Sequence, residues 1–189
     1  MITIRLSGSG GQGLLLAGRI MATAAGVYGE KYISHTQSYG PEARGGASKS
    51  DLIISDEEII FPRPDKVDVM LTLNQKSLDK YYSSLKDSGV LILDDSLIKI
   101  MPTENAFCIP FTHLAYTKLQ NKVFANVIAL GALNEIAKVV DFKYLQDAVV
   151  SSVPKKFTEF NLKALDIGVE EGKREISRYE ASEEIDWEL

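Results

Sequence analysis

The chain has 189 residues, a net charge of −5 and a pI of about 5.1, with 45% hydrophobic and 25% charged residues. This is ordinary for a globular protein and allows one domain with a substantial core. The absence of a basic cluster interleaved with aromatics argues against nucleic-acid binding. The single cysteine, Cys108, excludes an internal disulfide and an iron–sulfur cluster held by this chain alone.

The start of the chain shows no secretory signal, because Arg5 and a glycine-rich turn interrupt it before an apolar stretch forms. The longest near-apolar run, residues 123–133, contains Asn126 and is too short to span a bilayer. We therefore expect a cytoplasmic protein.

A first strand is predicted at residues 2–6, followed by the glycine-rich turn at 8–13 and a helix from 14 to about 27. Three glycines of the turn fit the G-x-G-x-x-G spacing, which brings backbone N–H groups at a helix start close to an anionic ligand. Residues 32–34 are read as a second strand that completes a β-α-β unit.

Residues 38–46 contain three glycines and a proline, so we expect an irregular loop. A strand is predicted at 47–55 and a shorter one at 59–61, closed by Pro62 and Pro64. Two strands this close together predict a hairpin inserted between parallel strands.

Nearly continuous apolar runs at 67–73 and 89–93 are typical of central parallel strands, and a helix over 75–85 is expected to join them. A more peripheral strand is predicted at 106–110.

From Lys122 onward the pattern is helical, with apolar residues at helical spacing, a second helix over about 142–150 and a third starting near Lys155. The predicted fold class is α/β: an open, Rossmann-like, mostly parallel sheet with helices on both faces and a helical C-terminal third. We expect one domain over 1–179, then an acidic tail at 180–189 that is exposed or contacts a partner.

The glycine turn alone leaves three functions open: a phosphate-bearing ligand, tight packing of the helix, or NAD. A dinucleotide site needs an acid at the end of the second strand. Ser34 and His35 lie there instead, and Glu30 precedes the strand. No Gly-Lys-Ser/Thr follows, so a P-loop is excluded.

Three segments together resemble the gamma subunit of 2-oxoacid:ferredoxin (acceptor) oxidoreductases. They are Gly-Ser-Gly-Gly-Gln-Gly at 8–13, Ser-Tyr-Gly-Pro-Glu-Ala-Arg-Gly-Gly at 38–46 and Asn-Val-Ile-Ala-Leu-Gly-Ala-Leu at 126–133. The resemblance covers nearly the whole chain, and the second segment is the specific one. The family includes enzymes for pyruvate, 2-oxoglutarate, ketoisovalerate and other branched-chain 2-oxoacids and, more distantly, indolepyruvate.

The resemblance implies thiamine-dependent oxidative decarboxylation of a 2-oxoacid to acyl-CoA, with 2-oxoglutarate favoured over pyruvate. This chain has no Gly-Asp-Gly followed by paired asparagines, so thiamine diphosphate, magnesium and the iron–sulfur clusters are expected mainly on other subunits. The implied partners are alpha, beta and ferredoxin-like subunits, with ferredoxin or another acceptor. The implied role of this chain is to help hold coenzyme A and complete the complex, without activity alone.

No catalytic or metal-binding residue is predicted. The coenzyme A-binding residues implied by the resemblance are Gly8, Gly10, Gly11, Gln12, Gly13, Ser38, Tyr39, Arg44 and Asn126. Each also has a plainer interpretation: Gln12 as a helix-start residue, Tyr39 as loop packing, Arg44 as a contact to Glu42 or a partner, and Asn126 as a structural amide.

Asn74 and Asp94 follow strands and are expected along the same rim, more as helix caps than as ligands. His35 and His113 lack metal-like spacing, and Cys108 is expected in the core.

An exposed apolar surface is also expected, because a subunit buries a face against its partners. The region from Lys122 onward and residues 62–64 are both candidates. Two other functions remain open: a freestanding NAD(P)-dependent oxidoreductase, and a purely structural assembly subunit.

Overall fold

The computed structural model describes residues 1–38, 46–103 and 105–185, with side chains described as far as residue 181. Six strands form one sheet in the order β2-β3-β1-β4-β5-β6. Their bounds are β1 Ile2–Ser9, β2 Tyr32–Ser38, β3 Ala47–Ser55, β4 Val67–Thr72, β5 Leu85–Asp94 and β6 Phe107–Ile109. Only β3 runs against its neighbours, β1 and β2, and the remaining pairs are parallel.

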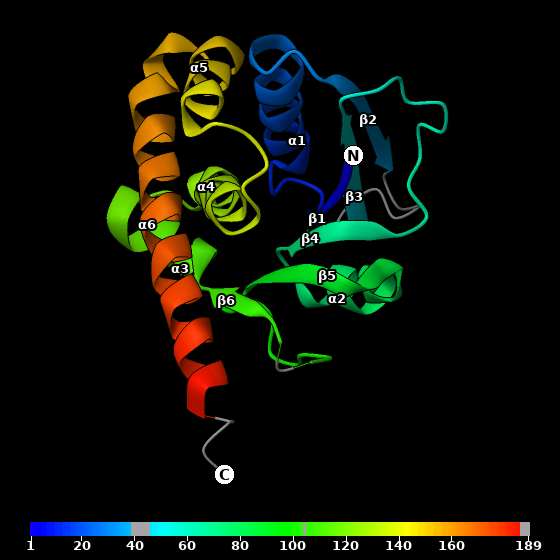
Figure 1. Ribbon diagram of the computed structural model, residues 1–189. Helices are drawn as coiled ribbons and strands as arrows, with labels where there is room; N and C mark the ends of the chain where they lie inside the picture. The colour runs from blue at the N-terminus through cyan, green and yellow to red at the C-terminus, as the bar shows by residue number, and fades with distance from the viewer. Residues whose placement is uncertain (39–45, 104, 186–189) are drawn as a thin grey trace.

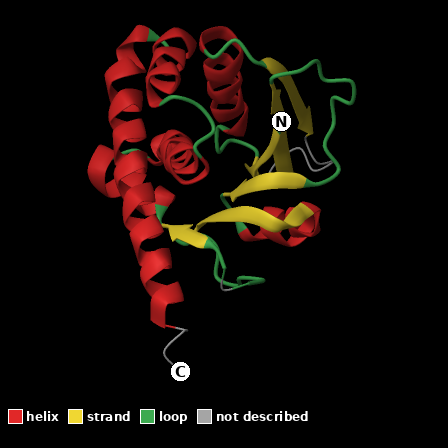
Figure 2. Ribbon diagram, in the orientation of Figure 1, coloured by secondary structure: helices red, strands yellow, loops and turns green. Residues whose placement is uncertain are grey.

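Helices cover both faces of this sheet, which confirms the predicted fold class (Figure 1). The helices are α1 Leu14–Thr23 with the π-helical turn η1 Ala24–Tyr28, α2 Gln75–Tyr81 with the 3-10 turn η2 Tyr82–Ser84, α3 Phe111–Leu119, the 3-10 turn η3 Lys122–Phe124, α4 Ala125–Ala137, α5 Phe142–Ser152 and α6 Lys155–Ile185. In Figure 1, α2 lies on one face, and α1, α3, α4, α5 and α6 lie on the other. Figure 2 separates the strands from this helical layer by colour.

Successive side chains of β4 point to opposite faces of the sheet, so this one strand contributes to the hydrophobic core on each face. Val69 and Leu71 point into the larger core shared with α1 and α4, and Met70 packs with Leu78 of α2. A strand buried on both faces needs apolar residues at successive positions, as its sequence has.

Helix α4 is surrounded, and residues 125–134 are all buried. Its close approach to α6 depends on glycines on both helices. A Cβ atom added to Gly168 would lie 2.9 Å from the backbone nitrogen of Ala132, and one added to Gly131 would lie 3.2 Å from Cα of Leu165. These positions have no room for a side chain, so the two backbones pack directly together.

The predicted hairpin is wrong in its second strand. Residues 59–61 form no strand, and Ile60 and Phe61 are about four-fifths exposed (80% and 82%). The hairpin is made instead by β2 and β3. Because β3 lies between β1 and β2, the predicted β-α-β unit does not join adjacent strands. The two prolines after Phe61 have no N–H groups to donate to a strand ladder.

Other boundaries also differ. Helix α3 has no counterpart among the predicted elements, the helix from Gln75 stops at Tyr81, and β5 begins at Leu85. Helix α6 continues to Ile185, so the first residues of the expected tail are helical. The division of the chain at residue 179 stays a prediction. Within the described residues, no helix combines the length and apolar character needed to cross a bilayer.

Candidate functional site

The glycine turn stands at the carboxyl edge of the sheet, where β1 ends and α1 begins. Gly11 and Gly13 have φ values of 94° and 73°, a conformation that favours glycine. Gly13 is the N-cap of α1, and no side chain caps the helix start. The turn therefore presents N–H groups without side-chain partners at the positive end of a helix, as an anion-binding turn does.

The side chain of Gln12 braces the turn. Its Oε1 accepts hydrogen bonds from the backbone N–H of Ser9 at 2.7 Å and from the Ser9 hydroxyl at 3.0 Å, and its Nε2 donates to the Leu73 carbonyl at 3.1 Å. Both polar ends of Gln12 are thus engaged within the chain, and the turn is tied to the end of β4. The predicted contact of Gln12 with a ligand stays a prediction.

Asn126 ties the turn to α4. Its Nδ2 donates to the Gly13 carbonyl at 3.0 Å, and a Cβ added to Gly13 would lie 3.0 Å from Cγ of Asn126. The side chain is only 3% exposed, and its buried Oδ1 has no hydrogen-bond partner among the described residues. A buried acceptor without a partner is uncommon. Asn126 therefore has a structural contact and a free acceptor beside the turn.

Strand ends from the other elements lie along the same edge, as expected from their shared direction. Asn74 caps α2 by accepting from the Ser77 N–H at 2.8 Å. Asp94 accepts from the N–H groups of Ser96 and Thr112, each at 3.1 Å, and so holds the start of α3. The predicted capping role is confirmed for Asn74 and wrong for Asp94, because the N-cap of α3 is Pro110 and no helix begins directly after β5.

Two hollows flank the turn. One, of about 230 Å³, lies toward β2 and β3 and is lined by Ser9, Gly10, Gly11, Gly13, Leu14, Leu15, Gln37, Ser48, Lys49 and Ser50. The other, of about 430 Å³, lies toward α3 and α4 and is lined by Gly11, Gln12, Leu73, Leu97, Thr112, Lys122, Val123 and Ala125. Gly11 lines both hollows, so the turn stands between them.

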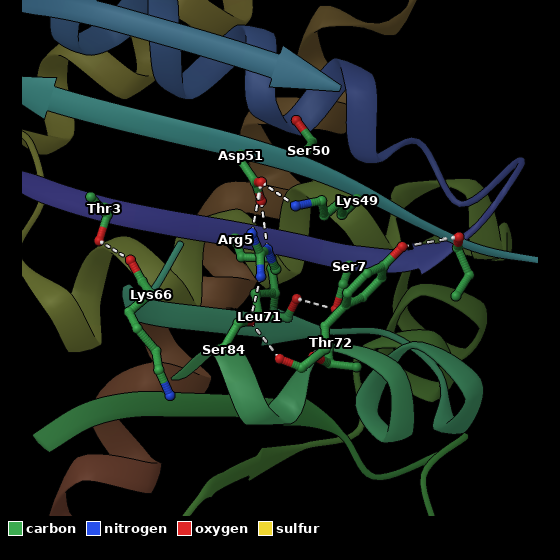
Figure 3. A network of polar contacts seen from close by, with 12 residues as sticks. Thr3, Arg5, Ser7, Lys49, Ser50, Asp51, Lys66, Leu71, Thr72 and Ser84 are labelled. Carbon is green, nitrogen blue, oxygen red and sulfur yellow. Dashed lines mark hydrogen bonds and ion pairs between the residues drawn. The ribbon is translucent and has the colours of Figure 1, made fainter. Parts of the chain in front are cut away.

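Lys49 was not among the predicted site residues, although it follows the glycine-rich loop closely. Its ammonium lies 2.7 Å from Oδ2 of Asp51. The same carboxylate also accepts hydrogen bonds from the Nε and Nη2 of Arg5. Figure 3 shows Asp51 between the two cations. Arg5 and Asp51 are 3% and 4% exposed and face each other directly across β1 and β3. Lys49 lines the smaller hollow, and its ammonium is paired with Asp51 and lies 5.8 Å from the ring centroid of Tyr81 on α2.

The same layer of polar groups continues beneath the turn. Ser7 and Thr72 exchange a hydrogen bond of 2.9 Å between β1 and β4, and Arg5 Nη1 also donates to the Ser84 hydroxyl (Figure 3). The Ser48 hydroxyl donates to the Gly8 carbonyl at 3.0 Å. These contacts fix the strand ends from which the turn projects.

His35 lies against α1, next to Ser50 of the smaller hollow. Its Nε2 is 2.7 Å from the Ser50 hydroxyl, and a Cβ added to Gly18 would lie 2.6 Å from the same nitrogen. Burial lowers the pKa of His35 below its usual value, and the charge of Asp51 acts in the opposite direction. Gly18 thus allows α1 to pack closely against the imidazole of His35.

The structure places six of the predicted site residues together, namely Gly8, Gly10, Gly11, Gln12, Gly13 and Asn126. Ser38 ends β2 at the same edge and is exposed. Tyr39 and Arg44 lie outside the described residues. Cys108, expected in the core, is half-buried on β6. Within the described part of the chain, no grouping of His, Cys, Asp and Glu could hold a metal ion.

A glycine turn in this position occurs in many folds, so comparison with known proteins decides the family. The family model described as pyruvate ferredoxin/flavodoxin oxidoreductase matches residues 3–171. The chain belongs to this family. It is a gamma subunit of a 2-oxoacid:ferredoxin oxidoreductase, and the resemblance found in the sequence is confirmed.

Among relatives in this family, 2-oxoglutarate synthase subunit KorC of Methanocaldococcus jannaschii is 44% identical over 174 residues, covering 90% of this chain and 93% of the relative. The keto/oxoacid ferredoxin oxidoreductase gamma subunit of Geobacter sulfurreducens has a similar structure, with a TM-score of 0.83, 42% identity and coverage of 92% of this chain and 99% of that one.

A more distant structure shares the fold. It is the 2-oxoglutarate:ferredoxin oxidoreductase of Magnetococcus marinus with 2-oxoglutarate, coenzyme A and succinyl-CoA bound. The match has a TM-score of 0.81 and 23% identity, and covers 92% of this chain but 31% of that one. There the fold is one part of a longer chain.

Proposed function

We propose that this gamma subunit holds coenzyme A at the glycine turn, within a complex that oxidatively decarboxylates 2-oxoglutarate to an acyl-CoA. The observation that carries the proposal is the uncapped start of α1 behind two positive-φ glycines. Lys49, whose ammonium pairs with Asp51, lines the adjoining hollow. Backbone N–H groups and a lysine ammonium suit the phosphates of coenzyme A.

The two hollows suit the two kinds of group in this ligand. The smaller hollow has Ser48, Lys49 and Ser50 in its lining as polar groups for phosphate oxygens, and the larger hollow, lined by Leu73, Leu97 and Val123, suits an uncharged arm. Asn126 offers a free acceptor oxygen beside the turn. Tyr39, Arg44 and Ser38 remain proposed ligand residues on the sequence pattern.

The chemistry of decarboxylation belongs to the rest of the complex in this proposal. Thiamine diphosphate with magnesium would supply the reacting centre, and iron–sulfur clusters would carry electrons to ferredoxin, all held mainly by alpha, beta and ferredoxin-like subunits. This chain would bind and orient coenzyme A, and would be inactive by itself. A cytoplasmic location completes the proposal.

The choice of 2-oxoglutarate is supported by the KorC relative, which is a 2-oxoglutarate synthase subunit. The test is the activity of the complex purified from its host on 2-oxoglutarate, pyruvate and 2-ketoisovalerate, with ferredoxin as acceptor. We expect the highest kcat/KM with 2-oxoglutarate. A higher value with either of the other acids would overturn the substrate assignment.

The coenzyme A site is tested by calorimetric titration of the purified chain and complex. We expect Lys49→Ala and Gly11→Ala each to weaken coenzyme A binding by about tenfold or more, since each removes or misplaces a charge-assisted contact. Lys143→Ala is the control, because Lys143 pairs with Asp147 on α5. Unchanged affinity with disturbed assembly would favour a purely structural subunit, and saturable NAD(P) binding would favour the dehydrogenase alternative.

A further inference from the structure

The exposed large apolar side chains include two groups that suit a partner contact. One is the pair Ile60 and Phe61 in the segment after β3. The other gathers side chains from the loop after β5, from α3 and η3, and from the start of α6. We call this second group the aromatic shelf, and its members are Leu97, Tyr116, Val123, Phe157 and Phe160, each at least 42% exposed.

The aromatic shelf is held together by contacts that the helices fix. The rings of Phe124 and Phe160 stack with centroids 5.7 Å apart, and Val123 is the neighbour of Phe124. Leu97 and Val123 line the same hollow. The surface is therefore built on the ends of packed helices, as a preformed docking surface is.

Two lysines border this surface. The ammonium of Lys122 lies 5.8 Å from the ring centroid of Tyr116, and that of Lys156 lies 4.9 Å from the centroid of Phe157. Neither lysine makes an ion pair with a described carboxylate. On a chain of net charge −5, this is an apolar surface with a locally positive rim.

The aromatic shelf is continuous with the candidate site. Leu97 and Val123 line the same 430 Å³ hollow as Gly11 and Gln12 of the glycine turn. Ile60 and Phe61 line neither hollow beside the turn. A partner on the aromatic shelf would therefore cover the open side of this hollow, whereas a partner on Ile60 and Phe61 would not.

Two of the similar structures indicate which kind of partner the aromatic shelf binds. In the Magnetococcus marinus enzyme this fold is 31% of a longer chain, whereas the Geobacter sulfurreducens gamma subunit is matched over 99% of its length. Where the fold is a separate subunit, surface contacts must replace the covalent connection. Such an interface needs a substantial apolar centre with a polar rim.

We infer that the aromatic shelf docks a larger subunit of the oxidoreductase complex, one that presents an apolar patch ringed by carboxylates. The docked subunit closes the hollow beside the glycine turn, so the ligand site lies at the junction of two subunits. This second point rests on the proposed function, whereas the docking itself does not.

The test is co-purification of the complex from the host through a tag on this chain. We expect Phe157→Ser/Phe160→Ser to reduce the recovery of the large subunits by about tenfold or more, as loss of aromatic anchors does. The matched control Ile60→Ser/Phe61→Ser should retain them. Full recovery with the shelf variant, or loss only with the control, would overturn the inference.

A second variant avoids the stacked rings, in case the first disturbs folding. Lys122→Glu/Lys156→Glu changes only exposed rim charges and should slow reassembly of separated subunits several-fold at low salt, with less difference at high salt. Equal rates for this variant and the wild type would count against the carboxylate-ringed partner.

Light scattering on the free chain tests whether the aromatic shelf binds a second copy of this chain instead of a larger subunit. A wild-type dimer that Phe157→Ser/Phe160→Ser converts to a monomer would assign the surface to a second copy and overturn the inference. Coenzyme A titration of the wild-type complex separates the two proposals. A shelf variant that fails to assemble, with no coenzyme A binding by the wild-type complex, would support docking and remove only the ligand assignment.

Discussion

The amide of Asn126 donates to the carbonyl of Gly13 across 3.0 Å, which ties the start of α4 to the residue that precedes α1. The two residues are 113 positions apart in the chain. The contact leaves the buried Oδ1 of Asn126 free beside the glycine turn.

We expect Asn126→Ala to lower the free energy of unfolding by about 0.5–1.5 kcal/mol and also to weaken coenzyme A binding. The stability cost is modest because the Gly13 carbonyl keeps its bond from the Ala17 N–H. The matched control is Asn134→Ala on the same helix, whose amide bonds only to the backbone of Val140. The control should lose stability but keep its affinity, measured by urea unfolding and calorimetry. Equal affinities would leave Asn126 a purely structural residue.

The buried pair of Arg5 and Asp51 should be costly to break from either side. Asp51→Asn leaves the Arg5 guanidinium without a buried counter-charge, and we expect a loss of about 3–5 kcal/mol in unfolding free energy. A double-mutant cycle with Arg5→Met and Asp51→Leu, measured by urea unfolding, should show a combined cost well below the sum of the single costs. Additive costs would mean that the two charges do not interact in the folded chain.

Close packing of α4 and α6 predicts a steric effect at Gly168. Gly168→Ala should lower the unfolding free energy by about 1–3 kcal/mol, because the added methyl group meets the α4 backbone near Ala132. Gly10→Ala is the comparison, since a Cβ there has no neighbour within 4 Å. Denaturation curves of the two variants should therefore differ clearly. A neutral Gly168→Ala would show that the helices can separate at no cost.

The lowered pKa of His35 predicts a pH dependence of stability. The folded chain resists protonation of this buried imidazole, so the unfolded chain binds the proton first as the pH falls through the usual value of 6.5. The stability contribution is complete above that pH and is lost as the pH falls through the lower folded pKa. The unfolding free energy of His35→Asn should fall less steeply with pH below 6.5 than that of the wild type. Parallel curves from urea unfolding at each pH would contradict this.

Local sequence determined the parts that depend on neighbouring residues. The turn at residues 8–13 needs glycine at positive φ, the apolar run at 67–73 needs burial on both faces, and the helix near Lys155 begins where predicted. The sequence also named residues 62–64 and the region from Lys122 onward as candidate partner surfaces, and these stay predictions. These features follow from backbone conformation and side-chain periodicity, which a short segment carries by itself.

Tertiary structure alone decided which segments meet. It placed β3 between β1 and β2, left Ile60 and Phe61 outside any strand, and set Arg5 opposite Asp51. It also built the aromatic shelf from three separate segments beside the turn. Pairings of this kind depend on the free energy of the whole sheet and its helix layer. The local propensity of a segment for strand or helix is too weak to choose among distant partners. The glycine turn could therefore be predicted from the sequence, whereas its surroundings required the fold.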